Sequence, residues 1–109
     1  MTMRAFYLTD ILHTGHHGVE YTPKVGEKYD ERRGKIMLLD DDKLEEGQRF
    51  PFVLYSEDEN GGMKAEKFVR ATYFERMYAE GDRIFLRTLN SIYVLKEAEA
   101  EVLERIKRT

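Results

Sequence analysis

The sequence predicts a mainly β domain, a small antiparallel β-barrel or rolled sheet of about six strands followed by a C-terminal α-helix. Short apolar runs alternate with turn signals, and Asn60-Gly61 has the composition of a hairpin turn. Near the C-terminus, the hydrophobic spacing changes to three and four residues, which is typical of a helix. A chain of 109 residues suits a single domain, residues 1–109. An α+β arrangement of two layers is the alternative.

The first expected strand covers residues 4–12, RAFYLTDIL. Side chains of an extended chain alternate between two faces, so Phe6, Leu8 and Leu12 should share one face. The opposite face then carries Tyr7, Thr9 and Ile11. Residues 13–34 are rich in glycine and too long for an ordinary tight connection, so we expect a functional or mobile loop there.

Two strands are expected in the middle of the chain. Residues 35–39, KIMLL, form a continuous apolar run that is typical of a buried strand. The acidic triplet at 40–42 ends this run, and we interpret it as protection of a strand end against edge pairing. Residues 50–55, FPFVLY, form the next strand, and Pro51 belongs at its start or on a sheet edge because proline has no N–H to donate.

Turn signals divide the following segment into hairpins. The stretch 57–62, EDENGG, contains an Asn-Gly pair that tolerates positive φ, so the preceding strand should fold back on a strand at 64–74. Residues 75–80 fit either a strand or a helix, and the sequence leaves both open. A second hairpin is expected to join residues 84–88 and 91–95.

Residues 97–108 are expected to form an amphipathic helix. Its apolar stripe recurs at three- and four-residue steps and consists of Leu95, Ala98, Val102, Leu103 and Ile106. Because few residues separate this helix from the preceding hairpin, we expect it to pack near that hairpin, with Leu103 mostly buried. The alternative is that the stripe forms a seam between two copies of the chain.

Charge and composition exclude several classes of protein. The chain has 18 basic and 21 acidic residues and a net charge of −3, so we do not expect a nucleic-acid-binding protein. Weak nucleic-acid binding on an arginine-bearing sheet face is kept as an alternative, with Arg70, Arg76, Arg83 and Arg87 as its residues. The absence of cysteine fits a cytoplasmic location, and no apolar run is long enough to span a membrane.

All three histidines lie in the segment 13–20, HTGHHGVE. Imidazoles and a carboxylate are the ligands that zinc, nickel, manganese and non-haem iron accept. The candidate residues of a divalent-metal or hydrolytic site are therefore His13, His16, His17 and Glu20. An exposed polar loop is the favoured interpretation, because adjacent histidines on an extended backbone point to opposite faces.

A basic cluster follows in the same long segment and consists of Arg32, Arg33 and Lys35. These residues are the candidates for binding a phosphate or another anion. Acidic residues stand beside them in the sequence, which favours the interpretation as a mixed-sign solvated loop.

The sequence contains no complete catalytic set. Ser56 and Ser91 are the only serines, and neither lies in a nucleophile elbow. No glycine loop with a lysine for nucleotide phosphates is present. We therefore expect a small binding or regulatory module rather than an enzyme, acting through a protein partner or as a homo-oligomer. No cofactor is expected apart from the divalent metal of the histidine hypothesis.

Overall fold

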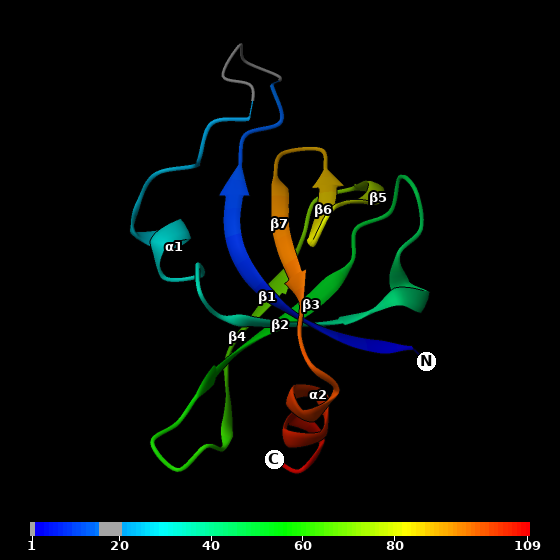
Figure 1. The fold of residues 1–109 in the computed structure, drawn as a ribbon. Coiled ribbons are helices and arrows are strands. Elements are labelled where there is room, and N and C mark those ends of the chain that lie inside the picture. Colours follow the sequence, from blue (N-terminus) through cyan, green and yellow to red (C-terminus); the bar gives the residue numbers. More distant parts are fainter. Residues whose placement is uncertain (1, 16–20) are drawn as a thin grey trace.

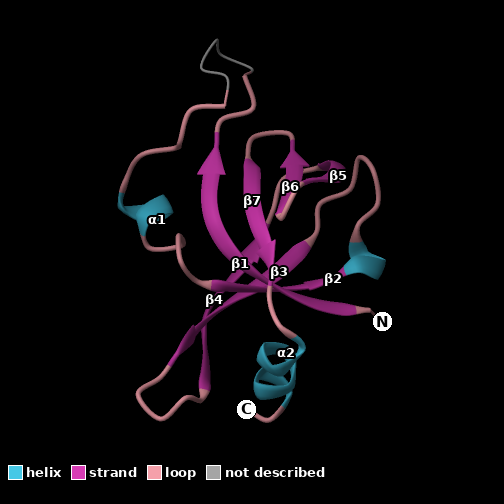
Figure 2. Ribbon diagram, in the orientation of Figure 1, coloured by secondary structure: helices cyan, strands magenta, loops and turns pink. Residues whose placement is uncertain are grey.

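The computed structural model describes residues 2–15 and 21–109 (Figures 1 and 2). Seven strands within these residues form one antiparallel sheet in the order β4-β3-β2-β1-β7-β6-β5. The strands are β1 (Met3–Leu12), β2 (Ile36–Asp40), β3 (Pro51–Glu57), β4 (Met63–Arg70), β5 (Phe74–Glu80), β6 (Arg83–Thr88) and β7 (Ile92–Glu97). The helices are α1 (Glu27–Asp30), the 3₁₀ turn η1 (Asp41–Lys43) and the C-terminal α2 (Ala100–Lys107). The mainly β class with a C-terminal helix is confirmed.

The sheet is rolled because its two edge strands are consecutive in the chain. β4 and β5 lie at opposite ends of the strand order, yet only residues 71–73 connect them. From the end of β4 to the start of β5 such a connection reaches only about 14 Å when extended, so the two edges must approach each other. Backbone hydrogen bonds of 2.8 Å from Ala71 to Phe50 and from Phe74 to Gln48 hold this corner. Among the described residues β4 and β5 do not pair, so the roll stays open.

The corner at residues 71–73 corrects the expected strand count. Residues 64–74 were expected as one strand, but β4 ends at Arg70 and β5 begins at Phe74. The stretch 75–80, for which strand and helix were both open, belongs to β5. The described sheet therefore has seven strands rather than about six.

Both expected hairpins are confirmed. β3 and β4 are joined through Asn60-Gly61, where Gly61 has a φ of +77°, a value that suits glycine. β6 and β7 form the second hairpin, and Pro51 is the first residue of β3, as its missing N–H requires.

A β-bulge in β1 changes which side chains enter the core. The register against β7 shifts between Leu8 and Asp10. Because this shift interrupts strict alternation, Ile11 joins Phe6 and Leu8 in the core, whereas Leu12 is half-buried. The prediction that Leu12 shares the buried face was wrong for this reason.

The main core lies inside the roll and draws on β1, β2, β3, β4, β6 and β7, with β5 side chains packed against it. Its fully buried side chains include Phe6, Met37, Phe52, Leu86 and Leu95. The rings of Phe52 and Tyr93 meet edge to face, with their centroids 5.3 Å apart. The Tyr93 phenol thus lies at the border between this core and the site described below.

Helix α2 packs on a part of the sheet that its position in the sequence did not indicate. Val102 and Ile106 are buried against Ala5, Ile36 and Met63, which come from β1, β2 and β4. The prediction that α2 packs on the β6–β7 hairpin was therefore wrong, and Leu103 is only half-buried. No helix within the described ranges is long and apolar enough to cross a membrane.

The acidic triplet at residues 40–42 has a local role. β2 lies between β1 and β3, so these residues do not protect a sheet edge. The Asp40 Oδ1 atom instead accepts hydrogen bonds from the backbone N–H groups of Asp42 (3.0 Å) and Thr2 (3.2 Å). Asp40 therefore caps η1 and ties down the N-terminal end of the described chain.

Candidate functional site

Two adjoining recesses lie between the segment that connects β1 to β2 and the strands that face this segment. One, the Lys67 recess, has a volume of about 190 Å³ and is lined by Arg32 and Lys35 on one side and by Leu54, Glu66 and Lys67 on the other. The second, the Ser91 recess, also has a volume of about 190 Å³ and lies between α1 and the β6–β7 turn. Arg32 lines both recesses, so we treat them as one site, the cationic cleft.

The charge of the cationic cleft is opposite to the charge of the protein. Six cationic residues line it, namely Lys24, Lys28, Arg32, Lys35, Lys67 and Arg70. Among the described residues, the carboxylates in its lining are Glu31 and Glu66, both in the Lys67 recess, and none lines the Ser91 recess. Because the whole chain carries −3, the fold has gathered a positive site within an acidic molecule.

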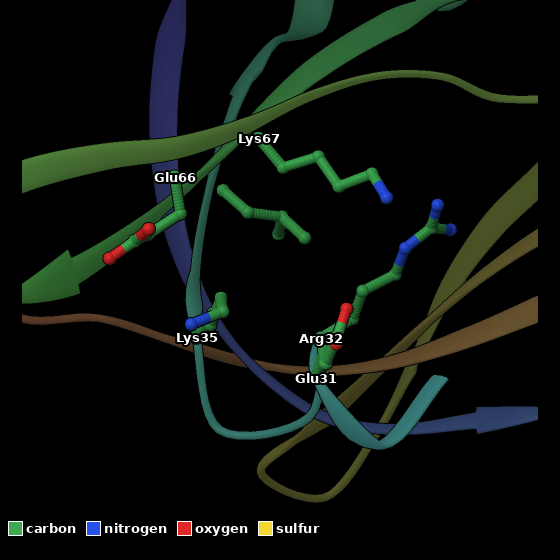
Figure 3. A pocket seen from close by; sticks show the side chains of 6 residues that line it. Glu31, Arg32, Lys35, Glu66 and Lys67 are labelled. Carbon is green, nitrogen blue, oxygen red and sulfur yellow. The ribbon is translucent and has the colours of Figure 1, made fainter. Parts of the chain in front are cut away.

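Arg32 is the central residue of the cleft. Its side chain follows α1 and is only 8% exposed. The buried Nε atom has no hydrogen-bond partner among the described residues. Figure 3 shows the Arg32 guanidinium and the Lys67 ammonium directed toward each other across the Lys67 recess. Two cations that converge without an acid between them are a favourable place for a negative charge.

The Ser91 recess is organised by Lys24. This buried lysine donates a hydrogen bond of 2.8 Å from Nζ to the Ser91 hydroxyl. The ammonium groups of Lys24 and Lys28 lie 5.2 and 5.6 Å from the centre of the Tyr29 ring, so one aromatic side chain holds both cations. An ammonium group offers only donors, so this arrangement provides hydrogen bonds to an anion rather than a general base.

Tyr93 lies between the Ser91 recess and the main core. Burial raises the pKa of its phenol, and the nearby Arg32 charge and a hydrogen bond with Ser91 offset part of that shift. The phenol therefore stays neutral at physiological pH while it lies close to both side chains. This places Arg32 and Ser91 around one buried hydroxyl group.

The carboxylate of Glu66 is already committed elsewhere. It accepts a hydrogen bond of 2.5 Å from the Ser56 hydroxyl. That hydrogen bond, together with the charges of Lys64 and Lys35, lowers the pKa of Glu66. In Figure 3 its side chain extends away from Arg32 and Lys67. Glu66 is therefore not directed at Arg32 or Lys67, and Glu31 is the other carboxylate that lines the Lys67 recess.

The structure separates the three residues of the predicted basic cluster. Arg32 and Lys35 line the cleft, whereas Arg33 is held in the scaffold beside it. The Arg33 guanidinium pairs with Asp10 and Asp30 at 2.9 Å each and donates to the backbone carbonyl of Ile11 at 3.1 Å. It also donates to the carbonyl of Lys24. Arg33 thereby fixes the segment that positions Lys24 against β1.

Of the four residues of the predicted metal site, His13 lies within the described structure. His13 exchanges backbone hydrogen bonds with Thr22 and Tyr21, at 2.9 and 3.1 Å. His16, His17 and Glu20 lie outside the described residues. Within residues 2–15 and 21–109, no three histidine or carboxylate side chains lie close enough together to hold a metal ion. The metal site at residues 13–20 stays a prediction.

Sequence reasoning missed most of the cleft. Lys67, Arg70 and Ser91 come from β4 and the β6–β7 turn, far from Arg32 in the chain. A usable signal existed in the spacing of Lys24, Lys28 and Arg32, which recur every four residues. That spacing favours one cationic side in any helical or turn-rich segment.

The four arginines that suggested a sheet-face stripe do not act together. Arg70 lines the Ser91 recess, and Arg87 forms an ion pair of 2.9 Å with Glu75. Arg76 lies over the Tyr78 ring at 5.0 Å, and Arg83 lines a different recess.

No protein-family model matches this chain, and no curated protein or solved structure is significantly similar to it.

Proposed function

We propose that this protein is a small binding module that takes a negatively charged ligand into the cationic cleft. The observation that carries the proposal is Arg32, a buried guanidinium whose Nε has no partner among the described residues. Leaving a buried charged donor unsatisfied costs free energy, and the attraction of an anion in the cleft to the guanidinium charge offsets that cost. Such an arrangement suits a binding site better than a structural one.

A binding function is favoured over catalysis by the chemistry of the lining. Among the residues that the structure describes, no histidine and no carboxylate lines the Ser91 recess, so these residues do not supply the side chains that most often act as a general base. The expectation that a protein partner is involved fits a partner that presents an anionic group to the cleft. A role for residues 13–20 in metal binding is a separate hypothesis that these contacts do not address.

The experiment is a titration with tripolyphosphate, a compact linear polyanion, followed by two-dimensional amide NMR spectroscopy. We expect saturable shifts for the amides of Tyr29, Arg32 and Ser91, which surround the cleft. The variant Arg32→Gln should lose most of this response. Lys43→Gln is the matched control, because Lys43 is an exposed cation in η1 that lines neither recess.

Two results would contradict the proposal. One is a spectrum that does not change with tripolyphosphate, which would mean that the gathered charge does not bind anions. The other is a response that is equally weakened in Arg32→Gln and Lys43→Gln, because that pattern indicates non-specific attraction to surface charge.

A further inference from the structure

We infer that the cationic cleft recognises a terminal phosphate group, the dianion of a phosphate monoester on a small molecule, and that this group sits in the Ser91 recess. The inference rests on the proposed function and names the ligand class of the same site. It depends on the charge, the donors and the size of that recess.

The charge of the recess exceeds what a single carboxylate would neutralise. Lys24, Lys28 and Arg32 surround it, and Arg70 extends its lining, with no acidic side chain among them. Near neutral pH, a phosphate monoester carries roughly 1.5 to 2 negative charges. A ligand with that charge density offsets the mutual repulsion of these cations better than a carboxylate, which carries one charge.

The donors around the recess match the oxygens of a tetrahedral anion. Arg32 lines the recess with a planar guanidinium, a group that suits phosphate oxygens. Lys24 is held by its hydrogen bond to Ser91 and uses one of three N–H donors there, so its ammonium group has further donors for an anion. Asn90 adds a side-chain amide to the lining, whereas the Thr72 hydroxyl already donates to Thr88 at 3.0 Å. Three phosphate oxygens can each accept from such a set.

The size of the recess favours a terminal group over a polymer. A volume of about 190 Å³ holds a phosphate and a few further atoms, and the rest of the ligand must lie outside. An internal phosphodiester of a nucleic acid carries one charge and continues on both sides, so it would leave the innermost cations unpaired. The net charge of −3 further opposes a long polyanion along the surface.

The test is isothermal titration of the full chain with four probes: glycerol 3-phosphate, sulfate, succinate and a short thymidine oligonucleotide without terminal phosphates. Affinity for glycerol 3-phosphate should rise about tenfold between about pH 5 and about pH 7.5, because the ester loses its second proton near pH 6. Sulfate remains a dianion throughout, so its affinity should not rise. It therefore controls for titration of the protein itself.

The groups that face the bound phosphate are Lys24, Lys28, Tyr29, Arg32, Arg70 and Tyr93, with Glu31 and Glu66 in the neighbouring recess. No histidine lines either recess within the described residues, so the rise with pH belongs to the ligand. Arg32→Gln should weaken glycerol 3-phosphate binding roughly ten- to hundredfold, as expected for a lost charged hydrogen bond. Lys28→Gln, at an exposed position, should weaken it by less, and Lys43→Gln should leave it unchanged.

Each outcome decides between the two proposals. Binding of glycerol 3-phosphate with the stated pH dependence and loss in Arg32→Gln supports the phosphate assignment. Tighter binding of succinate or of the oligonucleotide, still dependent on Arg32, overturns the phosphate assignment and leaves the anion-binding module intact. Failure of all four probes, in a chain whose thermal unfolding shows it to be folded, overturns both.

Discussion

Two adjacent arginines are expected to affect stability with opposite signs when each is replaced by methionine. Methionine keeps a long unbranched side chain that fills similar space and removes only the guanidinium. Arg32 is 8% exposed and has a buried Nε without a partner among the described residues, whereas Arg33 pairs with Asp10, Asp30 and two backbone carbonyls. The comparison thus separates a guanidinium held for a ligand from one that holds the fold.

The magnitudes follow from these contacts. An unsatisfied buried polar group costs about 1–3 kcal/mol, so Arg32→Met should raise the free energy of unfolding by roughly 1–2 kcal/mol. Loss of a mostly buried, fully bonded charge is expensive, and Arg33→Met should lower the same free energy by about 2–4 kcal/mol. The lower end allows for the partial exposure of Arg33 and Asp10.

The assay is urea unfolding at neutral pH in a buffer without phosphate or sulfate, because a bound anion would stabilise the wild-type protein and hide the effect. With the usual denaturant slopes, Arg32→Met should move the midpoint upward by roughly 0.5–1 M urea. A decrease of the unfolding free energy in Arg32→Met by about 1 kcal/mol or more would refute the reasoning. It would mean that the guanidinium already stabilises the ligand-free fold.

Two further predictions concern helix α2. Ile106 is 6% exposed and packs against Met63 and its neighbours, so Ile106→Ala should lower the free energy of unfolding by about 2–4 kcal/mol. Leu103 is half-buried, so Leu103→Ala should lower it by roughly 1 kcal/mol. Equal losses for the two variants in urea unfolding would contradict the packing described. The Tyr7 hydroxyl donates a hydrogen bond of 2.6 Å to Glu99, and this bond lowers the pKa of the Glu99 carboxyl. The stability that the hydrogen bond contributes is therefore present above the ordinary pKa of glutamate. It is lost as the pH falls through the lowered pKa of the folded state. At neutral pH, Tyr7→Phe should therefore unfold at a lower urea concentration than the wild type, and the two midpoints should converge near about pH 2. A difference between the midpoints that stays constant across this pH range would show that it does not arise from the hydrogen bond to Glu99.

The extent of the sequence prediction can be judged from particular elements. The Asn60-Gly61 hairpin, the β6–β7 hairpin and the α2 helix were all predicted, because turn preference and hydrophobic period act within a few residues. The corner at residues 71–73 was missed, because it depends on backbone hydrogen bonds to Phe50 and Gln48, which lie more than twenty residues earlier. The β1 bulge was missed because strict alternation was assumed across Leu8 and Asp10.

The sequence by itself determined the mainly β class, the two hairpins, the amphipathic helix and the presence of Arg32 within a basic cluster. Only the tertiary structure decided that Arg32 is buried, that Arg33 is part of the scaffold, and that Lys67 and Ser91 lie beside Arg32. The physical reason is that local preferences depend on a residue and its near neighbours in the chain. The electrostatic character of a site depends instead on every charge that folding brings near it, and on how much water folding removes.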